Sequence, residues 1–567
     1  MTEALTIALA QLNPTVGDLE GNVELVRAAR QAAAAEGADL VVAPELVVSG
    51  YPPEDLVLKP AFQDRIEALV GDLAAETGDG GPALLLGTPW RREGRLYNAA
   101  VLLDGGKVAA LSLKTDLPNY GVFDEKRVFS VGPQPQPVAF RGVSLGVLIC
   151  EDVWTQAPVD ALTAAGAEIL VVLNGSPFEA AKFSERVGLM AERIQGNGRP
   201  LIYVNQVGGQ DELVFDGASF VLNGDGARAV QAPAWQSTVV ATAWQRGQGG
   251  WHCAEGAIEE PPEGLESVYQ AMVAGLRDYV DKNGFPGVVL GLSGGIDSAL
   301  SAAVAADALG PGRVRCIMLP SVYTSEESLI DAAECARLMG ARLEEIPIVP
   351  GVAALHDMLT AAFAGRAPDI TEENIQARLR GLVLMALSNK FGDMVLTTGN
   401  KSEMSVGYAT LYGDMCGGYS VLKDVYKTMV FALSRWRNQH HPAGGLGPQG
   451  RVIPERIITK PPSAELRPDQ TDQDSLPEYE ALDDILGCLI EAEMALPEIV
   501  ARGHDEATVR RIEHLLYIAE YKRRQSPPGV KITRRNFGRD RRYPITNRFR
   551  DRGGKVAGGS GGSQRPQ

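Results

Sequence analysis

Short apolar runs alternate with amphipathic stretches along the first 245 residues. The runs that predict buried strands lie at 5–12, 38–46, 83–90, 144–152, 168–174 and 200–207. Amphipathic stretches at 22–37 and 179–198 predict helices, and turn residues at 104–106 and 223–226 predict two hairpins. Strands separated by helices, with hairpins inserted, indicate an α/β layered sandwich with mixed sheets.

A second block of the same alternation follows a stretch rich in Gly, Pro and Glu that carries no sustained periodicity. An amphipathic helix comes first, an apolar strand follows at 288–293, and helices and strands then alternate up to a strand at 393–400. This order predicts a parallel, doubly wound sheet with ligands at the carboxyl ends of its strands. The predicted organisation is a domain at 1–245, a linker at 246–264, a domain at 265–550 and a disordered Gly/Ser-rich tail at 551–567.

The composition is that of a folded chain without a membrane span. Of 567 residues, 45% are hydrophobic and 22% charged, so a large core can form, and no run approaches the roughly 20 apolar residues that a span needs. The start, MTEALTIALAQL, lacks the basic region of a signal peptide. The six cysteines form no C-x-x-C pair, which predicts a reducing, cytoplasmic location.

The net charge of −17 argues against nucleic acid as a partner. A local exception is the segment 522–552, with 12 basic and two acidic residues. Pro and Gly interrupt this segment, and on so acidic a chain we expect it to neutralise a dinucleotide pyrophosphate or to pack against an acidic neighbour.

Three candidate catalytic residues, Glu45, Lys114 and Cys150, each follow an apolar run. A cysteine at a sheet edge needs a base to become a thiolate, and a nearby carboxylate can supply one. An ammonium group would lower the thiol pKa and stabilise an oxyanion, which points to acyl transfer from an amide. Taken singly, two of these residues have a plainer interpretation: a Glu after a strand is usually a cap or an ion-pair partner, and a buried Cys usually belongs to the core.

The short sequence motifs around these residues are more specific than the residues taken alone. P-E-L at 44–46, L-K-T-x-L-P-N-Y at 113–120 and C-E-D-x-W at 150–154 together resemble the nitrilase superfamily. The resemblance implies a four-layer αββα sandwich in which Glu45 is the general base, Lys114 the electrostatic stabiliser and Cys150 the nucleophile. It also implies an accessory carboxylate and residues that hold a glutamine substrate, which are Glu125, Tyr120, Ser176 and Lys182.

A candidate phosphate loop, S-G-G-I-D-S at 293–298, connects the strand at 288–293 to a helix. Its glycines allow a tight turn, and N–H groups at the helix start can cradle an anion. Asp297 can ligate Mg²⁺, and the flanking serines offer hydroxyls to phosphate. The chain contains no G-x-x-x-x-G-K-[ST]. The loop resembles that of the ATP-pyrophosphatase (adenine nucleotide alpha hydrolase-like) enzymes, which split ATP into AMP and pyrophosphate to adenylate a substrate.

Four downstream motifs reduce the number of families that the second block resembles. They are ENIQARLRG at 373–381, TTGNKSE at 397–403, YGDMCGGYSVLKDVYK at 412–427 and EYKRRQSPPGVK at 520–531. With the amidase-like unit before them, they resemble the glutamine-dependent NAD⁺ synthetases over about residues 1–550. This implies ATP-dependent amidation of deamido-NAD⁺ to NAD⁺, the last step of NAD⁺ biosynthesis, with ammonia from glutamine and release of AMP, pyrophosphate and glutamate. It also implies a homo-oligomer with a shielded passage for ammonia.

The same resemblance implies the residues of the second site. ATP would contact Gly291, Leu292, Ser293, Gly294, Gly295, Ile296, Asp297, Ser298, Arg378, Thr398 and Lys427. Deamido-NAD⁺ would contact Asn374, Glu403, Asp414 and Lys522, and Mg²⁺ would bind Asp297 and Glu403. The residues alone leave two alternative functions open. One is an amidotransferase for another carboxylate or a nucleobase, and the other is a nitrilase-type amidase whose second unit only binds a regulatory nucleotide.

Overall fold

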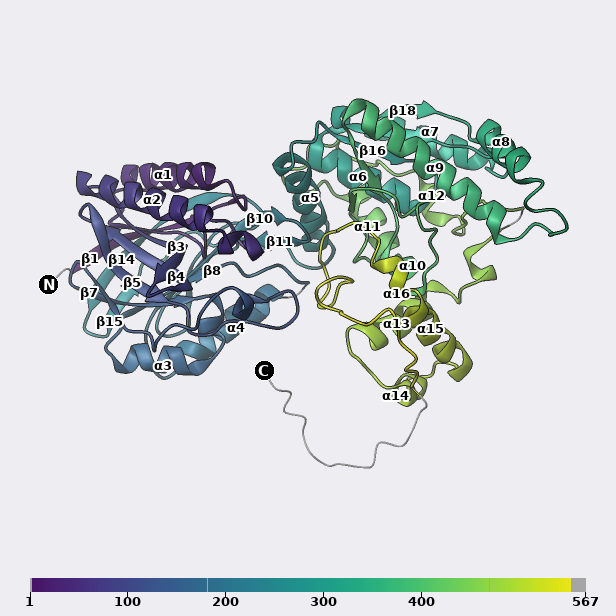
Figure 1. The fold of residues 1–567 in the computed structure, drawn as a ribbon. Coiled ribbons are helices and arrows are strands. Elements are labelled where there is room, and N and C mark those ends of the chain that lie inside the picture. The colour runs from purple at the N-terminus through teal and green to yellow at the C-terminus, as the bar shows by residue number, and fades with distance from the viewer. Residues whose placement is uncertain (1–2, 181, 469, 552–567) are drawn as a thin grey trace.

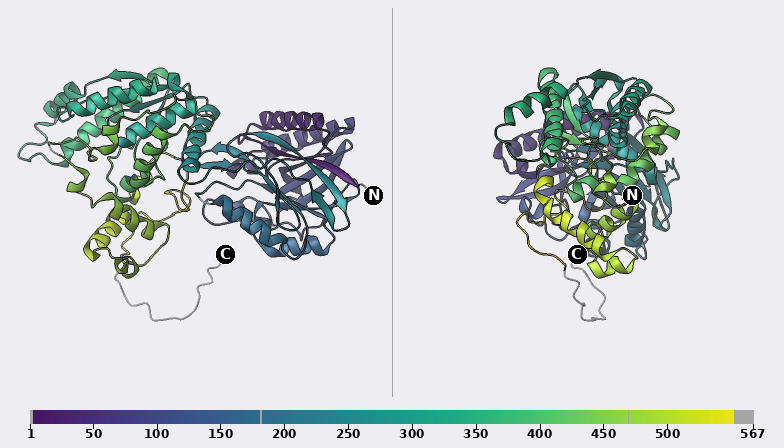
Figure 2. Two further views of the ribbon diagram at one scale, coloured as in Figure 1. Left: turned by 180° about the vertical axis from the view of Figure 1, so that it is seen from behind. Right: turned by 90° about the vertical axis from the view of Figure 1, so that its right-hand side faces the viewer.

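The computed structural model describes residues 3–180, 182–468 and 470–551, so the predicted tail lies outside the described residues from 552 onward. The chain folds into two α/β units that lie side by side in Figure 1 and in the reverse view of Figure 2. In the described residues, no helix combines the length and the apolar character that crossing a bilayer requires.

Two mixed sheets face each other in the first unit. One has the order β15-β14-β1-β2-β3-β4-β5 and the other the order β13-β12-β9-β8-β7-β6. The first sheet consists of β1 (Ala4–Gln11), β2 (Leu40–Val42), β3 (Ala83–Arg92), β4 (Arg95–Asp104), β5 (Lys107–Leu113), β14 (Thr238–Gly247) and β15 (Gly250–Cys253). The second consists of β6 (Val138–Phe140), β7 (Val143–Ile149), β8 (Ile169–Asn174), β9 (Leu201–Asn205), β12 (Phe220–Leu222) and β13 (Arg228–Gln231).

Helices cover the outer face of each sheet (Figure 1). The helices α1 (Leu19–Ala35) and α2 (Pro60–Glu76) pack on the first sheet, and α3 (Gln156–Ala164) and α4 (Lys182–Ile194) on the second. Apolar side chains from both sheets meet between them in a separate core. The αββα sandwich and both hairpins, β4–β5 and β12–β13, are therefore confirmed.

The stretch 246–264, predicted to be a linker, takes part in the first unit. Strand β15 pairs antiparallel with β14, and the Gly256 and Glu259 amides donate to Ala229 and Gln231. The Gly and Pro content of this stretch favoured a linker over a short edge strand. Four residues are also too few to show the alternation of apolar and polar positions that predicts a strand. The exact border between the units stays a prediction.

The second unit is built on a parallel sheet of order β18-β17-β16-β19-β20, which confirms the doubly wound prediction. Its strands are β16 (Val288–Gly291), β17 (Val314–Met318), β18 (Arg342–Glu345), β19 (Met394–Thr397) and β20 (Tyr419–Ser420). One face packs on α5 (Gly264–Lys282), α6 (Ile296–Leu309), α7 (Glu326–Met339), α11 (Lys427–Gln439) and α12 (Glu455–Thr459). The other face carries α8 (Val349–Leu359) and α9 (Ile370–Phe391).

A helical lobe with its own core completes the second unit. It consists of α10 (Lys401–Val406), α13 (Tyr479–Ile490), α14 (Leu496–Ala501), α15 (Glu506–Ile518) and α16 (Glu520–Arg523). Helix α5 packs against the hairpin β10 (Val207–Gln210) and β11 (Leu213–Asp216) of the first unit. The segment after α16 then returns between the two units, where Lys531 and Ile532 exchange backbone hydrogen bonds with Glu212 and Ala180.

Candidate active sites

Three strand ends bring Glu45, Lys114 and Cys150 together in the first unit. Lys114 Nζ donates a hydrogen bond to Glu45 Oε1 at 2.7 Å, and neither side chain is exposed. Cys150 is also buried, and both charges act on its thiol. The sequence-predicted residues are therefore gathered at one place, held by ends of both facing sheets.

The backbone around each residue explains its position. Lys114 directly follows β5, and Cys150 directly follows β7, where the chain turns into a 3₁₀ turn at Cys150–Val153. Cys150 has a φ of +44°, an uncommon conformation for a residue with a side chain, and such strain is often found at functional sites. Glu45 lies in the loop after β2, close against Gly87, where a Cβ would come within 2.6 Å of the Glu45 Cα.

Burial controls the protonation of this cluster. It raises the pKa of the Cys150 thiol well above its usual value, and Glu45 raises it further while Lys114 opposes the rise. Burial also raises the pKa of Glu125 to about 7, although Lys114 lies 2.9 Å from both of its oxygens. Burial alone would lower the pKa of Lys114, but the two facing carboxylates raise it well above its usual value. The resting thiol is therefore protonated beside a charged pair.

The residues expected to hold glutamine surround this cluster. Tyr120 is 53% exposed, and its hydroxyl donates to Glu151, the residue after Cys150, at 3.1 Å. Ser176 is buried after β8, and its amide donates to Asn205 Oδ1 at 3.0 Å. Lys182 is the first residue of α4, and its ammonium group interacts electrostatically with the Cys150 thiol.

Sequence reasoning missed three donors that fix the carboxylates. Asn98 Nδ2 donates to Glu45 Oε1 at 2.7 Å, and the Gly175 amide donates to Glu45 Oε2 at 2.9 Å. The Tyr51 hydroxyl donates to Glu125 Oε1 at 3.0 Å. Gly175 could have been suspected, because it directly follows an apolar strand, but an Asn in the middle of β4 gives no signal.

A cavity of about 570 Å³ opens at the carboxyl ends of the parallel strands in the second unit. It lies where β16 and β19 are neighbours and the strand order reverses, the usual ligand position in such sheets. Of the predicted residues, it is lined by Gly291, Leu292, Ser293, Gly295, Ile296, Asp297, Ser298, Asn374, Arg378, Thr398, Glu403, Asp414, Lys427 and Lys522. Gly294 lies behind them with φ +77°, where a Cβ would come within 2.3 Å of the Ser328 carbonyl oxygen.

Asp297, Glu403 and Lys427 form a charge cluster in the wall of this cavity. Lys427 Nζ lies 2.5 Å from Asp297 Oδ2 and 3.1 Å from Glu403 Oε1. Asn400, which sequence reasoning missed, donates to Asp297 Oδ1 at 2.8 Å and caps α10 together with Glu403. The N-x-x-E spacing was an available signal for this cap. Burial raises the pKa of Glu403 to about 8 against the effect of Lys427.

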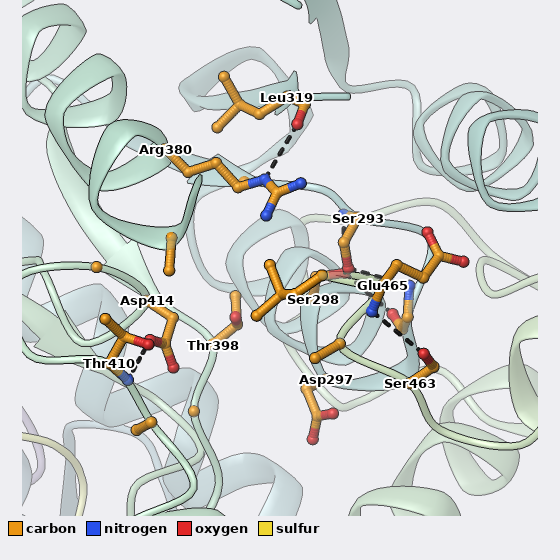
Figure 3. A pocket seen from close by; sticks show the side chains of 18 of the residues that line it. Ser293, Asp297, Ser298, Leu319, Arg380, Thr398, Thr410, Asp414, Ser463 and Glu465 are labelled. Carbon is orange, nitrogen blue, oxygen red and sulfur yellow. Dashed lines mark hydrogen bonds between the residues drawn. The ribbon is translucent and has the colours of Figure 1, made fainter. Parts of the chain in front are cut away.

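The loop 407–414 organises the opposite wall. Thr410 donates through its hydroxyl to Asn374 Oδ1 at 2.8 Å and through its amide to Asp414 Oδ1 at 2.7 Å. Lys522 Nζ donates to two carbonyl oxygens of this loop, both at 2.7 Å. Figure 3 shows Thr410 and Asp414 across the cavity from the phosphate loop. Of the residues predicted for the dinucleotide, Asn374, Asp414 and Lys522 are thus joined by one loop.

The segment 460–472 covers part of the cavity, and sequence reasoning did not single it out. Its Glu465 accepts hydrogen bonds from the Ser325 and Ser328 hydroxyls at 2.8 and 2.6 Å, and Ser463 lies beside it (Figure 3). The segment has no regular structure over 461–468, so no periodicity could reveal it.

The basic segment packs against acidic neighbours, one of the two outcomes expected for it. Its ion pairs include Lys531–Glu179, Arg535–Glu493, Arg539–Glu54 and Arg541–Glu520. Glu54 and Glu179 belong to the first unit, so the segment joins the two units by charge.

Comparison with known proteins agrees with this division. The carbon-nitrogen hydrolase family matches residues 6–250, and the NAD synthase family matches residues 268–526. A glutamine-dependent NAD⁺ synthetase of Rhodobacter capsulatus is 55% identical over 97% of this chain and 100% of its own length. The chain belongs to the glutamine-dependent NAD⁺ synthetase family.

Other NAD⁺ synthetases support this membership. The glutamine-dependent NAD⁺ synthetase of Xylella fastidiosa strain Temecula1 is 46% identical over 97% of this chain and 100% of its own. The structure of a glutamine-dependent NAD⁺ synthetase from Acinetobacter baumannii in complex with adenosine diphosphate is 43% identical. It covers 96% of this chain and 99% of its own, with a TM-score of 0.77. Family membership decides against a nucleobase amidotransferase and against an amidase with a purely regulatory second unit.

Proposed function

We propose that the two sites of this glutamine-dependent NAD⁺ synthetase act in series, the first supplying ammonia and the second using it to amidate deamido-NAD⁺. The observation that carries this proposal is the buried Glu45–Lys114–Cys150 cluster in the same chain as an AMP-forming type of phosphate loop. Only the combination of the two sites makes NAD⁺ from glutamine.

In the first site, Glu45 accepts the thiol proton of Cys150, whose sulfur attacks the side-chain amide carbon of glutamine. Lys114 Nζ stabilises the oxygen of the tetrahedral intermediate, and the intermediate collapses to a thioester as ammonia leaves with the proton that Glu45 returns. Water then releases glutamate. The raised thiol pKa supports this role for Glu45, because the thiol stays protonated until the base acts. Glu125 holds Lys114, and Tyr120, Ser176 and Lys182 hold glutamine.

In the second site, the amides and hydroxyls of residues 291–298 hold the ATP phosphates. Thr398, Arg378 and Lys427 contact ATP, and Asn374, Glu403, Asp414 and Lys522 contact deamido-NAD⁺. The nicotinate carboxylate attacks the α-phosphorus of ATP and expels pyrophosphate. Ammonia then attacks the adenylated carbonyl carbon and displaces AMP, which gives the amide of NAD⁺.

The residues present fit a Mg²⁺ ion. Asp297 and Glu403 point one oxygen each at Lys427 Nζ, so a positive charge already stands between two carboxylates. Mg²⁺ prefers one or two carboxylates completed by phosphate oxygens and water, and the phosphate loop adjoins this pair. We propose that Asp297 and Glu403 hold the ion, which would neutralise phosphate charge. Asn400 would orient Asp297 for that task.

The surface of α9 supports a homo-oligomer. Although the helix spans 22 residues, its side chains are mostly exposed or half-buried, and Leu382 is 64% exposed. A second copy packed against Leu382 would bury this side chain. Ammonia is mostly protonated and unreactive in bulk water near neutral pH, so a shielded passage between the two sites would keep it reactive. The six free cysteines support a reducing cytoplasm as its location.

The test compares nitrogen donors on the wild type and on Cys150→Ala. With ATP and deamido-NAD⁺, the wild type is expected to form NAD⁺ and AMP from glutamine or from ammonium. Cys150→Ala should lose the glutamine reaction and keep the ammonium reaction, because its second site is intact. Absence of AMP and NAD⁺ with either donor on the wild type would refute the proposal.

A further inference from the structure

Asn98 occupies an unfavourable environment in the first unit. It lies in the middle of β4, a strand with neighbours on both sides, and it is fully buried. Asparagine is a poor strand former, and within the described residues its Oδ1 has no hydrogen-bond partner. A buried polar atom without a partner destabilises a fold. A leucine of similar size would avoid this loss, so the asparagine points to a task for its other side-chain atom, Nδ2.

This nitrogen lies beside both carboxylates of the site, but it favours one of them. Asn98 Nδ2 donates to Glu45 Oε1 at 2.7 Å, and it lies 3.5 Å from Glu125 Oε2, at the outer limit of a hydrogen bond. The Lys114 ammonium group contacts both carboxylates at similar distances, 2.7 Å to Glu45 and 2.9 Å to Glu125. Lys114 therefore serves the two carboxylates alike, whereas Asn98 distinguishes them.

The partners of the two carboxylates also differ in whether they can accept a hydrogen bond. Among the described residues, Glu45 accepts from three groups that can only donate. They are the Lys114 ammonium group, the Asn98 Nδ2 group and the Gly175 amide. Such a lining favours the ionised form, because the proton of a neutral Glu45 would face donors. Glu125 instead contacts the Tyr51 hydroxyl, which can accept as well as donate, and burial raises the pKa of Glu125 to about 7.

We propose that Asn98 is the positioning residue that makes Glu45 the base of the first site, because it holds Glu45 ionised and leaves the shared proton to Glu125. The Asn98 carbonyl also accepts from the Lys114 amide at 2.9 Å, a contact that a change of side chain leaves in place. The inference rests on the proposed role of Glu45 as the base. The other titratable groups that act on this pair are Lys114, Tyr51, Cys150 and Glu151.

The test is the pH dependence of glutamine hydrolysis by full-length Asn98→Leu, which removes the donor and keeps a side chain of similar size. In the wild type, kcat/KM should fall on the acid side as Glu45 takes up a proton. In Asn98→Leu this fall should begin about one to two pH units higher, the effect of one hydrogen bond to a charged group. Asn98→Asp, which adds a carboxylate at the same place, should shift it further in the same direction.

Asn223→Leu is the matched control. Asn223 is also buried in the first unit, but its side chain holds the backbone of Cys253 in the edge strand β15. Its loss should leave the pH profile of glutamine hydrolysis as in the wild type. Ammonium-dependent NAD⁺ formation at the wild-type rate reports a folded chain for each variant.

A second measurement covers variants that turn glutamine over too slowly. Alkylation of Cys150 by iodoacetamide also requires loss of the thiol proton, and peptide mass spectrometry follows it without turnover. Its acid limb should shift as that of hydrolysis does. A purely structural Asn98 would slow both reactions equally at every pH, and an acid limb that stays in place would overturn the inference. Glutamine hydrolysis by Cys150→Ala would instead refute the proposed function.

Discussion

Lys114→Met isolates the central electrostatic contact of the first site. The ammonium group has no exposure and neutralises two buried carboxylates, Glu45 at 2.7 Å and Glu125 at 2.9 Å. Removing one partner of a buried ion pair typically costs 3–5 kcal/mol, since the other charge is left without compensation. Here Asn98 and Tyr51 still donate to the carboxylates, and Glu125 can take up a proton. We therefore expect Lys114→Met to lower the free energy of unfolding by about 3 kcal/mol, the lower end of that range.

This loss is measurable by scanning calorimetry. For a unit of this size, 1 kcal/mol shifts the melting temperature by about 2–4 °C, so the first unit should melt about 6–12 °C lower. Glutamine hydrolysis should fall by about 10²–10³, as when an oxyanion donor is lost, while ammonium-dependent NAD⁺ formation continues. Lys107→Met, at the exposed start of the same strand β5, is the control. Wild-type melting together with wild-type glutamine turnover in Lys114→Met would refute the reasoning.

Three further changes probe other parts of the molecule. Lys427→Met should abolish NAD⁺ formation with either nitrogen donor but spare glutamine hydrolysis, and AMP production is the readout. Folded Glu125 keeps its proton up to a pKa of about 7, whereas its ordinary value is 4.5, so its contribution makes stability fall as pH rises between these values. Melting curves of Glu125→Gln should therefore lose that part of the pH dependence, and an unchanged slope would contradict it. Gly175→Ala would place a Cβ 2.9 Å from the Tyr51 ring and 3.2 Å from Glu45 Oε2, so hydrolysis should slow at least tenfold, by about 1.4 kcal/mol or more.

The sequence predicted the parts of each site that follow regular elements. Lys114 and Cys150 directly follow strands, and Asp297 lies in the first turn of helix α6, shortly after strand β16, so local pattern placed them. Asn98 could not be found in this way, because its contact joins a residue of β4 to Glu45, 53 positions away in the loop after β2. The segment 460–472 was equally hidden, since its contacts with α7 depend on how the whole sheet folds.

The edge strand β15 shows a different limit of prediction from the sequence. Its four residues, Gly250–Cys253, contain a glycine and follow a Gly-rich turn, so composition favoured a linker. Pairing with β14 decides its structure, and pairing is a tertiary contact. For the same reason, the sequence could not decide whether the basic segment 522–552 neutralises a pyrophosphate or packs against acidic residues. Its acidic partners Glu54 and Glu179 lie far away in the sequence.

Transfer of nitrogen from the first site to the second can be followed with an isotope. The wild type is supplied with ATP, deamido-NAD⁺, glutamine labelled with ¹⁵N in its amide, and excess unlabelled ammonium at a pH where little of it is free ammonia. We predict that mass spectrometry finds ¹⁵N in the carboxamide of most NAD⁺ formed, and none when Cys150→Ala replaces the wild type. NAD⁺ without label from the wild type would contradict the central claim that the two sites work in series.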